Sequence, residues 1–113
     1  MTDAGTNDTL RVTVAPDGAI VASGDIDVAG GPVLEAVLLE QEGQLDADGS
    51  IVVDLTEVTF IDSSGLRSLL SASRRAGERS AKVVLRSPSS SVRRLLEITG
   101  TTAQFRIEDS DSA

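Results

Sequence analysis

The chain has 113 residues, a formal net charge of −8, and neither cysteine nor histidine. This composition excludes a disulfide framework and a Ser-His-Asp hydrolase, and it removes the usual zinc ligands. An acidic chain also lacks the basic face that displaces counterions from nucleic acids, and an anionic membrane surface would repel it. We therefore expect one compact cytoplasmic domain that binds a protein, is not an enzyme, and contacts neither nucleic acid nor membrane.

The first two predicted elements are strands that form a hairpin. Apolar and polar residues alternate over 9–15, and a second short run follows at 19–23 after the turn signal Pro-Asp-Gly. The small polar residues 1–8 and the final residues 109–113 are typical of flexible ends. These limits predict a single domain over residues 9–108.

The first helix is predicted to begin at Pro32, since proline suits a first turn, where its missing N–H would be unpaired anyway. Three glutamates of this helix are expected to face solvent: Glu35, Glu40 and Glu42. The β-branched run at 51–55 then predicts a strand that is covered on both sides.

A second helix is predicted after a connection at 56–62. Leucines recur at helical spacing from Ser64 onward, and Gly77 is placed to cap the end of the helix. We expect this helix to pack its leucines inward and to present its arginines to solvent.

The remaining predicted elements are a strand, a helix that opens at Pro88 and ends at Gly100, and a last short strand. The two strands cover residues 82–86 and 104–107. Strands that alternate with helices predict an α/β fold, with a mixed, mostly parallel sheet, an antiparallel N-terminal strand and three main helices.

The segment 60–66, which reads FIDSSGL, lies between the buried strand and the second helix. Ligands of open α/β sheets tend to bind at such a position, beyond the carboxyl end of a strand. Asp62, Ser63 and Ser64 are all favoured N-caps, so capping alone explains these residues in most proteins.

Two neighbours of the serines favour a functional role. Gly65 removes a side chain, so that another backbone can approach closely. Arg67 is a cation in the first helical turn, where the helix dipole disfavours it, and an anion on Ser63 or Ser64 would reverse that penalty. The N–H groups of a helix start also accommodate a phosphate. These arguments do not choose between the two serines.

The segment 53–66, VDLTEVTFIDSSGL, resembles the signature of STAS domains, in particular of bacterial anti-sigma factor antagonists. Residues 24–27 (GDID) resemble the Gly-Glu-Leu-Asp before the family's first helix, and residues 88–100 resemble its last helix. The chain departs from the family at Gly30, where threonine is common, and at 101–102, where two threonines replace an apolar pair. The core of the signature is intact.

The resemblance implies a cycle of partner switching. The unmodified antagonist binds an anti-sigma factor that is also an ATP-dependent serine kinase, and so frees a sigma factor. The kinase phosphorylates the serine after the aspartate, here Ser63, and a metal-dependent serine phosphatase restores the unmodified form. ATP and magnesium belong to the kinase, so we expect no cofactor or metal on this chain and a monomer when it is free. The implied docking residues are Asp27, Asp62, Ser63, Ser64, Gly65 and Arg67.

Other interpretations are open to test. The chain could be a STAS subunit of a transporter or a multiprotein signalling assembly that is never phosphorylated. The glycines near residue 30 have neither dinucleotide nor Walker spacing, which argues against nucleotide binding. Four aspartates could hold a cation only if the fold brought them together: Asp25, Asp27, Asp54 and Asp62.

Overall fold

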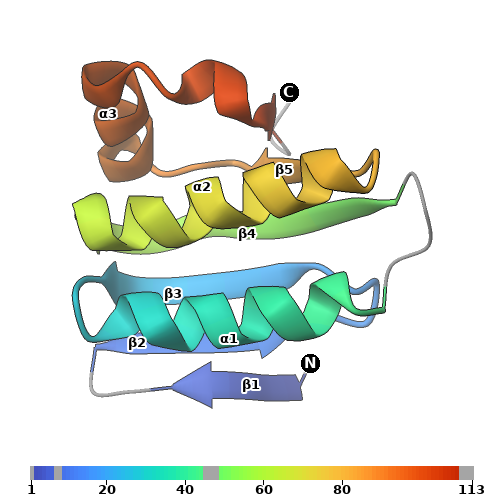
Figure 1. Ribbon diagram of the computed structural model, residues 1–113. Coiled ribbons are helices and arrows are strands. Elements are labelled where there is room, and N and C mark those ends of the chain that lie inside the picture. Colours follow the sequence, from blue (N-terminus) through green and yellow to red (C-terminus); the bar gives the residue numbers. More distant parts are fainter. Residues whose placement is uncertain (1, 7–8, 45–48, 110–113) are drawn as a thin grey trace.

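The computed structural model describes residues 2–6, 9–44 and 49–109. Within them, six strands form one sheet, with neighbours in chain order (Figure 1). The strands are β1 (Thr2–Thr6), β2 (Leu10–Val14), β3 (Ile20–Ile26), β4 (Ser50–Ile61), β5 (Lys82–Arg86) and β6 (Arg106–Glu108). The helices are α1 (Gly30–Glu42), α2 (Ser63–Glu78), α3 (Ser90–Thr99) and the 3-10 turn η1 (Thr102–Gln104).

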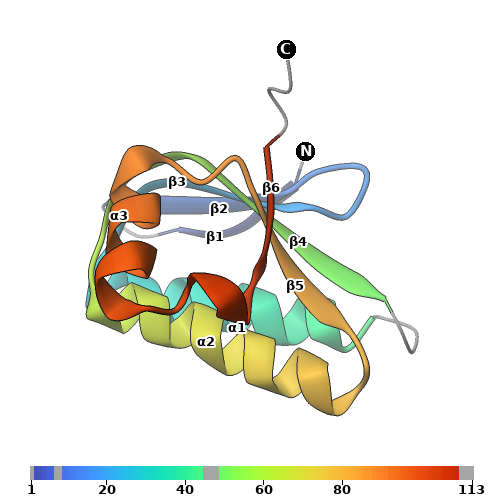
Figure 2. The same ribbon diagram turned by 90° about the horizontal axis from the view of Figure 1, so that it is seen from above.

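The sheet is mixed, as the sequence predicts. The pairs β1–β2 and β2–β3 are antiparallel, whereas β3, β4, β5 and β6 run parallel to one another. Figure 2 shows α1 and α2 side by side on one face of the sheet. The core between the sheet and the helices is almost entirely aliphatic, and Phe105 is its one aromatic member among the described residues. The predicted α/β class is therefore confirmed.

Helix α3 lies beside the second half of β4. Strand β5 pairs with β4 only from Ser50 to Asp54, so the later residues of β4 have no strand on that side. There the Ser89 N–H donates to the Leu55 carbonyl at 3.2 Å, and the Ser91 hydroxyl donates to the Thr59 carbonyl at 3.1 Å. These bonds hold α3 against the edge that β5 leaves.

Two of the predicted non-regular segments are strands in the structure. Residues 1–8 were expected to be a flexible end, but Thr2–Thr6 forms a strand that pairs with β2. The small polar residues of this segment give no sequence signal for that pairing. Residues 56–62 were expected to be a connection, yet β4 continues to Ile61 because β3 runs alongside it. Residues 1, 7–8 and 110–113, parts of the predicted ends, lie outside the described residues.

Helix boundaries differ from the predicted ones by one or two residues. Helix α1 begins at Gly30, two residues before Pro32, because Asp27, further upstream, accepts the Gly30 N–H. Helix α3 begins at Ser90, after Pro88, and ends as predicted at Gly100, whose φ of 69° is left-handed. Helix α2 does not end at Gly77 but continues to Glu78.

The predicted exposure of Glu42 is wrong. Glu42 is only 6% exposed, since its carboxylate faces α2 and accepts two hydrogen bonds from Arg75, both of 2.7 Å. Arg75 also donates to Glu35 at 3.1 Å, and Arg79 donates to the Glu42 carbonyl at 2.7 Å. The hydrogen bonds of Arg75 to Glu42 raise the pKa of this arginine most, and the charges of Glu42 and Glu35 raise it further. We call Glu35, Glu42, Arg75 and Arg79 the ion cluster.

Candidate functional site

Helices α1 and α2 both begin at the same edge of the sheet, at the left of Figure 1. They follow the parallel strands β3 and β4, whose last residues Ile26 and Ile61 are register partners. The Asp62 N–H donates to the Ile26 carbonyl at 3.2 Å, which ties the second strand end to the first. The positive ends of two helix dipoles therefore lie next to each other at this edge.

Asp62 is the N-cap of α2. Its Oδ1 accepts hydrogen bonds from the N–H groups of Ser64 at 2.9 Å and Gly65 at 3.1 Å. One carboxylate thus satisfies two of the free donors at the helix start. Of the three capping candidates in the sequence, the structure uses the aspartate, and neither serine hydroxyl is needed for the cap.

The side chain of Asp27 makes a similar pair of bonds just before α1, whose N-cap is Ala29. Asp27 Oδ1 accepts hydrogen bonds from the N–H groups of Ala29 at 3.1 Å and Gly30 at 2.9 Å. These are the second and third residues after Asp27, as Ser64 and Gly65 are after Asp62. We call residues 26–30 and 61–65 the twin junctions. The family resemblance implies a docking role for Asp27 and gives no sign of these bonds, although the spacing Asp-x-x-Gly occurs at both junctions.

Glycines let the two junctions pack closely. A Cβ on Gly65 would lie 2.5 Å from Ile26 Cγ2 and 2.8 Å from the Ile26 carbonyl oxygen. A Cβ on Gly31 would lie 3.4 Å from the Ser64 carbonyl oxygen, so α1 and α2 also approach each other here. The backbone approaches closely at Gly65, as expected, but it is that of the chain's own Ile26, so this glycine is explained by internal packing and not by a partner. Gly65 itself is buried, so it shapes the surface from below.

Ser63 is the first residue of α2 and is exposed. Its hydroxyl makes no hydrogen bond to any residue that the structure describes. Ser64 is half-buried, while Arg67, one helical turn further on, is exposed and forms no ion pair within the described ranges. The structure thus brings together an available hydroxyl and an available cation on one side of α2.

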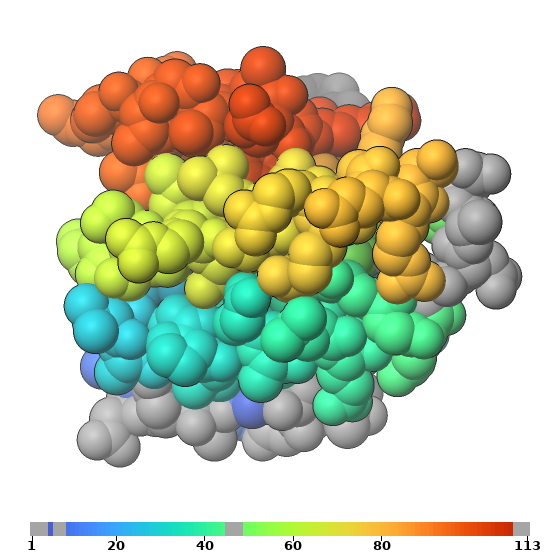
Figure 3. Space-filling model, viewed as in Figure 1, coloured from blue at the N-terminus to red at the C-terminus, as the bar shows by residue number. Residues whose placement is uncertain are grey.

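Two exposed apolar residues lie in or next to the twin junctions. Val28, which directly follows Asp27, is 71% exposed, and Phe60, near the end of β4, is 49% exposed. Figure 3 shows the first turns of α1 (cyan) and α2 (yellow-green) in contact at this end of the molecule. Sequence analysis did not single out Val28, although an apolar residue between an aspartate and a helix start was visible.

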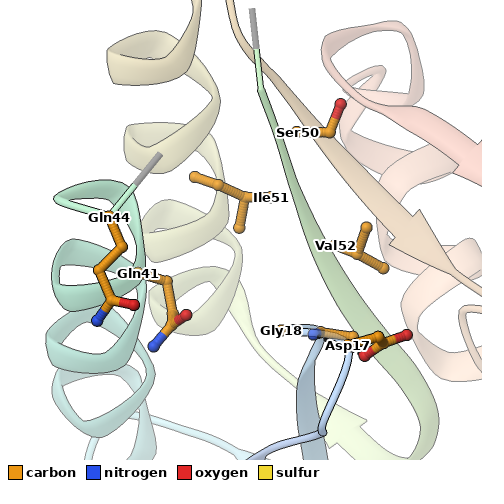
Figure 4. Close-up of a pocket in the computed structure, with 8 residues that line it drawn as sticks. Asp17, Gly18, Gln41, Gln44, Ser50, Ile51 and Val52 are labelled. Carbon is orange, nitrogen blue, oxygen red and sulfur yellow. Dashed lines mark hydrogen bonds between the residues drawn. The ribbon is translucent and has the colours of Figure 1, made fainter. Parts of the chain in front are cut away.

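Three hollows formed by the described residues are lined by residues away from Ser63. Figure 4 shows one of about 240 Å³ between the hairpin turn at Asp17, the end of α1 at Gln41 and the start of β4 at Ile51. It is therefore at the amino ends of β3 and β4, opposite the twin junctions. The surface around Ser63 suits a broad contact rather than an enclosed small ligand.

The four aspartates proposed as a cation site are used separately. Asp25 accepts the Thr59 hydroxyl at 2.6 Å, Asp54 accepts the Thr56 hydroxyl at 2.7 Å, and Asp27 and Asp62 bond to N–H groups at helix starts. Across residues 2–6, 9–44 and 49–109 there is no group of three carboxylates placed to hold a metal. None of the helices in those ranges has the length and apolar content to cross a bilayer.

Comparisons with known proteins agree with the fold. A model of the STAS domain family matches residues 11–112. The anti-sigma-F factor antagonist RsfB of Mycobacterium tuberculosis is 34% identical over 105 residues, which cover 88% of this chain and 82% of RsfB. A crystal structure of an anti-sigma factor antagonist from Mycobacterium paratuberculosis is 29% identical with a TM-score of 0.70, covering 92% of this chain and 89% of that one. The antagonist SpoIIAA, solved in its unphosphorylated form, shares the fold at 19% identity, with a TM-score of 0.69 and coverage of 91% and 89%.

Proposed function

Since the chain belongs to the STAS domain family, we propose that it is an anti-sigma factor antagonist controlled by a phosphate on Ser63. The unmodified chain binds an anti-sigma factor that is also a serine kinase, and a sigma factor is released. The kinase transfers the γ-phosphoryl group of ATP to Ser63 Oγ, the hydroxyl proton leaves, and ADP is the other product. A serine phosphatase hydrolyses the phosphate, and the exchange takes place in the cytoplasm. The chain's own role is binding rather than turnover.

The observation that carries this proposal is the free hydroxyl of Ser63. A serine at a helix start is most often a cap, and its hydroxyl is then bonded to the backbone and not free to meet a kinase. Here Asp62 makes both capping bonds, so Ser63 can be modified without disturbing the start of α2. The hydroxyl is exposed and therefore accessible to a kinase.

The surroundings also accommodate the product. A phosphate adds about −1.5 to −2 charges at pH 7, and the N-terminus of a helix stabilises an anion. Arg67 lies four residues after Ser63, the spacing at which side chains on a helix meet. We therefore expect phosphorylation to change the surface and to leave the fold in place.

Exposure favours Ser63 over Ser64 as the acceptor. Ser64 is half-buried, and its carbonyl lies beside Gly31 of the neighbouring helix. Because Ser64 is less exposed than Ser63, a phosphate on its hydroxyl would lose more of its contact with water. Ser63 has no such neighbour among the contacts described, so the same modification costs less there.

The test is phosphorylation by the anti-sigma factor kinases encoded in the same genome. Each purified kinase is incubated with ATP and with the wild type, Ser63→Ala or the matched control Ser64→Ala. We expect phosphate on the wild type and on Ser64→Ala, located at Ser63 by mass spectrometry, and none on Ser63→Ala. Undiminished modification of Ser63→Ala would refute the assignment. Tight binding that no kinase and ATP can reverse would favour the unswitched subunit of a larger assembly.

A further inference from the structure

The charges of the chain are divided unevenly along the sequence. Residues 1–62 contain thirteen carboxylates and one cation, Arg11, whereas residues 63–113 contain nine cations and five carboxylates. The formal charge is therefore −12 for the first part and +4 for the second, which together give the −8 of the whole chain. We call these parts the acidic half and the basic half. The change of sign falls between Asp62 and Ser63.

The fold keeps the two halves apart in space. Strand order in the sheet follows chain order, so β1, β2, β3 and α1 lie on one side, and α2, β5, α3 and β6 lie on the other (Figure 1). Strand β4 forms the border in the sheet, and the border in the helical layer is the seam between α1 and α2 (Figure 3). The protein thus has an electrostatic polarity that its net charge does not reveal.

Some of the opposite charges are already paired across this border. Glu35 and Glu42 pair with Arg75 in the ion cluster. The Asp17 carboxylate lies 3.7 Å from the Arg86 guanidinium. These contacts join the halves and neutralise part of the charge on each side, so the charges that matter to a partner are the unpaired ones.

Unpaired charges of opposite sign remain on α1 and α2. Arg67 and Arg74 of α2 are exposed and form no ion pair with any residue that the structure describes. They are seven residues apart, so they lie two turns from each other on one face of the helix. On α1, Glu40 is exposed and likewise forms no ion pair among the described residues. The outer surface of the helical layer is therefore negative over α1 and positive over α2.

A partner that reaches Ser63 meets both signs of charge. Asp25, Asp27 and Asp62 precede the border on the acidic side, at the ends of β3 and β4. Arg67 lies one turn beyond Ser63 on the basic side. A specific interface buries about 800 Å² on each partner, or roughly 20–30 residues, so it extends over both halves. Because like charges that face each other across an interface oppose binding, a partner that fits here is itself divided in sign.

Resting on the proposed function, we propose that the anti-sigma factor kinase has the opposite polarity, with cations facing the acidic half and negative charge facing the basic half. The γ-phosphate of ATP is part of that negative charge, since the kinase must bring it to Ser63, the first residue of the basic half. The start of α2 and Arg67 attract such an anion. The two polarities then turn the proteins toward each other before contact, with ATP on the α2 side, and this raises the rate of association.

The experiment reverses one charge on each half at matched positions. Glu40 lies ten residues after the start of α1, and Arg74 lies eleven residues after the start of α2, so both are about 15–17 Å along their helices. The chains compared are the wild type, Glu40→Lys, Arg74→Glu and the double variant, which keeps the net charge at −8. Stopped flow measures the association rate constant with each purified kinase at 0.01 M and 1 M NaCl, where the Debye length is about 30 Å and about 3 Å.

We expect each single variant to associate about threefold more slowly than the wild type at 0.01 M NaCl, the double variant about tenfold more slowly, and all four chains alike at 1 M. If net charge alone guided association, the single variants would shift in opposite directions and the double variant would match the wild type, and this result would overturn the inference. Unchanged thermal unfolding of the variants is the control for the fold.

The phosphorylation assay keeps this inference separate from the proposed function. A wild type that no kinase binds or phosphorylates would overturn both. A wild type that is phosphorylated on Ser63, together with a double variant that associates as fast as the wild type at 0.01 M NaCl, would overturn the inference alone.

Discussion

The two ends of the α1–α2 layer are held together in opposite ways. At the amino ends of the helices, backbones approach each other through glycines, and each aspartate bonds to its own helix. At the carboxyl ends, charged side chains cross from one helix to the other in the ion cluster. One end therefore binds the helices by side chains that must stay in place. At the amino ends the helices are joined by backbone contact and by the Ser68 hydroxyl, which donates to the Gly31 carbonyl at 3.2 Å, while Ser63 and Arg67 bond to no described residue.

The largest effect is expected at the ion cluster. Arg75→Ala removes both hydrogen bonds to the Glu42 carboxylate and leaves that buried charge without its partner. We expect a loss of about 3 kcal/mol in the free energy of unfolding, measured with urea. The control Arg74→Ala removes an exposed arginine of the same helix and should cost less than about 0.5 kcal/mol. Similar losses for both variants would contradict the special role of the ion cluster.

The next effect is expected at the glycine contact of the twin junctions. Gly65→Ala forces a Cβ to within 2.5 Å of Ile26 Cγ2, so β3 and α2 must move apart, at a cost of about 2 kcal/mol. Gly77→Ala in the same helix meets nothing within 4 Å and should instead stabilise by about 0.5–1 kcal/mol. Urea unfolding of the two variants should give shifts of opposite sign. A stabilising Gly65→Ala would show that the junction is loosely packed.

A smaller effect is expected from the cap. Asp62→Ala leaves the N–H groups of Ser64 and Gly65 without their acceptor and should cost about 1 kcal/mol in thermal or urea unfolding. Asp62→Asn keeps an acceptor oxygen and should lose only a fraction of that. If the two substitutions cost the same, the charge of Asp62 matters more than its hydrogen bonds.

The smallest effect on stability is expected at Ser63. Ser63→Ala removes an exposed hydroxyl that bonds to no described residue, so the free energy of unfolding should change by less than about 0.5 kcal/mol. The same variant should take up no phosphate. A loss as large as that of Asp62→Ala would mean that Ser63 supports the helix after all. If the expected values are found, Asp62 supports the fold, whereas its neighbour Ser63 is available to the partner.

The sequence predicts the order of most elements because their periodicities are local properties. It misses β1 because Thr2–Thr6 has no apolar alternation and is a strand only through its pairing with β2. It misses the second half of β4 because the burial pattern there is irregular where the register with β3 shifts. Both errors arise because the pairing of a strand depends on a second segment, so the residues of one segment alone do not reveal it.

The candidate site was predictable to a similar degree. The segment 60–66 was found from its place between strand and helix, but the division of labour between Asp62 and Ser63 required the hydrogen bonds of the structure. Helical spacing places Glu42 and Arg75 on polar faces and does not reveal that these faces meet. Val28 stood out only when its exposure was known.

The position of α3 beside β4 bears on self-association. An unpaired strand edge is a template on which another copy of a chain can add a strand. The part of β4 beyond Asp54 would be such an edge, and it runs directly toward Ser63. Because the carbonyls of Leu55 and Thr59 are bonded to Ser89 and Ser91 at the start of α3, a strand from a second molecule would have to displace this helix first. The start of α3 therefore competes with a second copy for this stretch of β4.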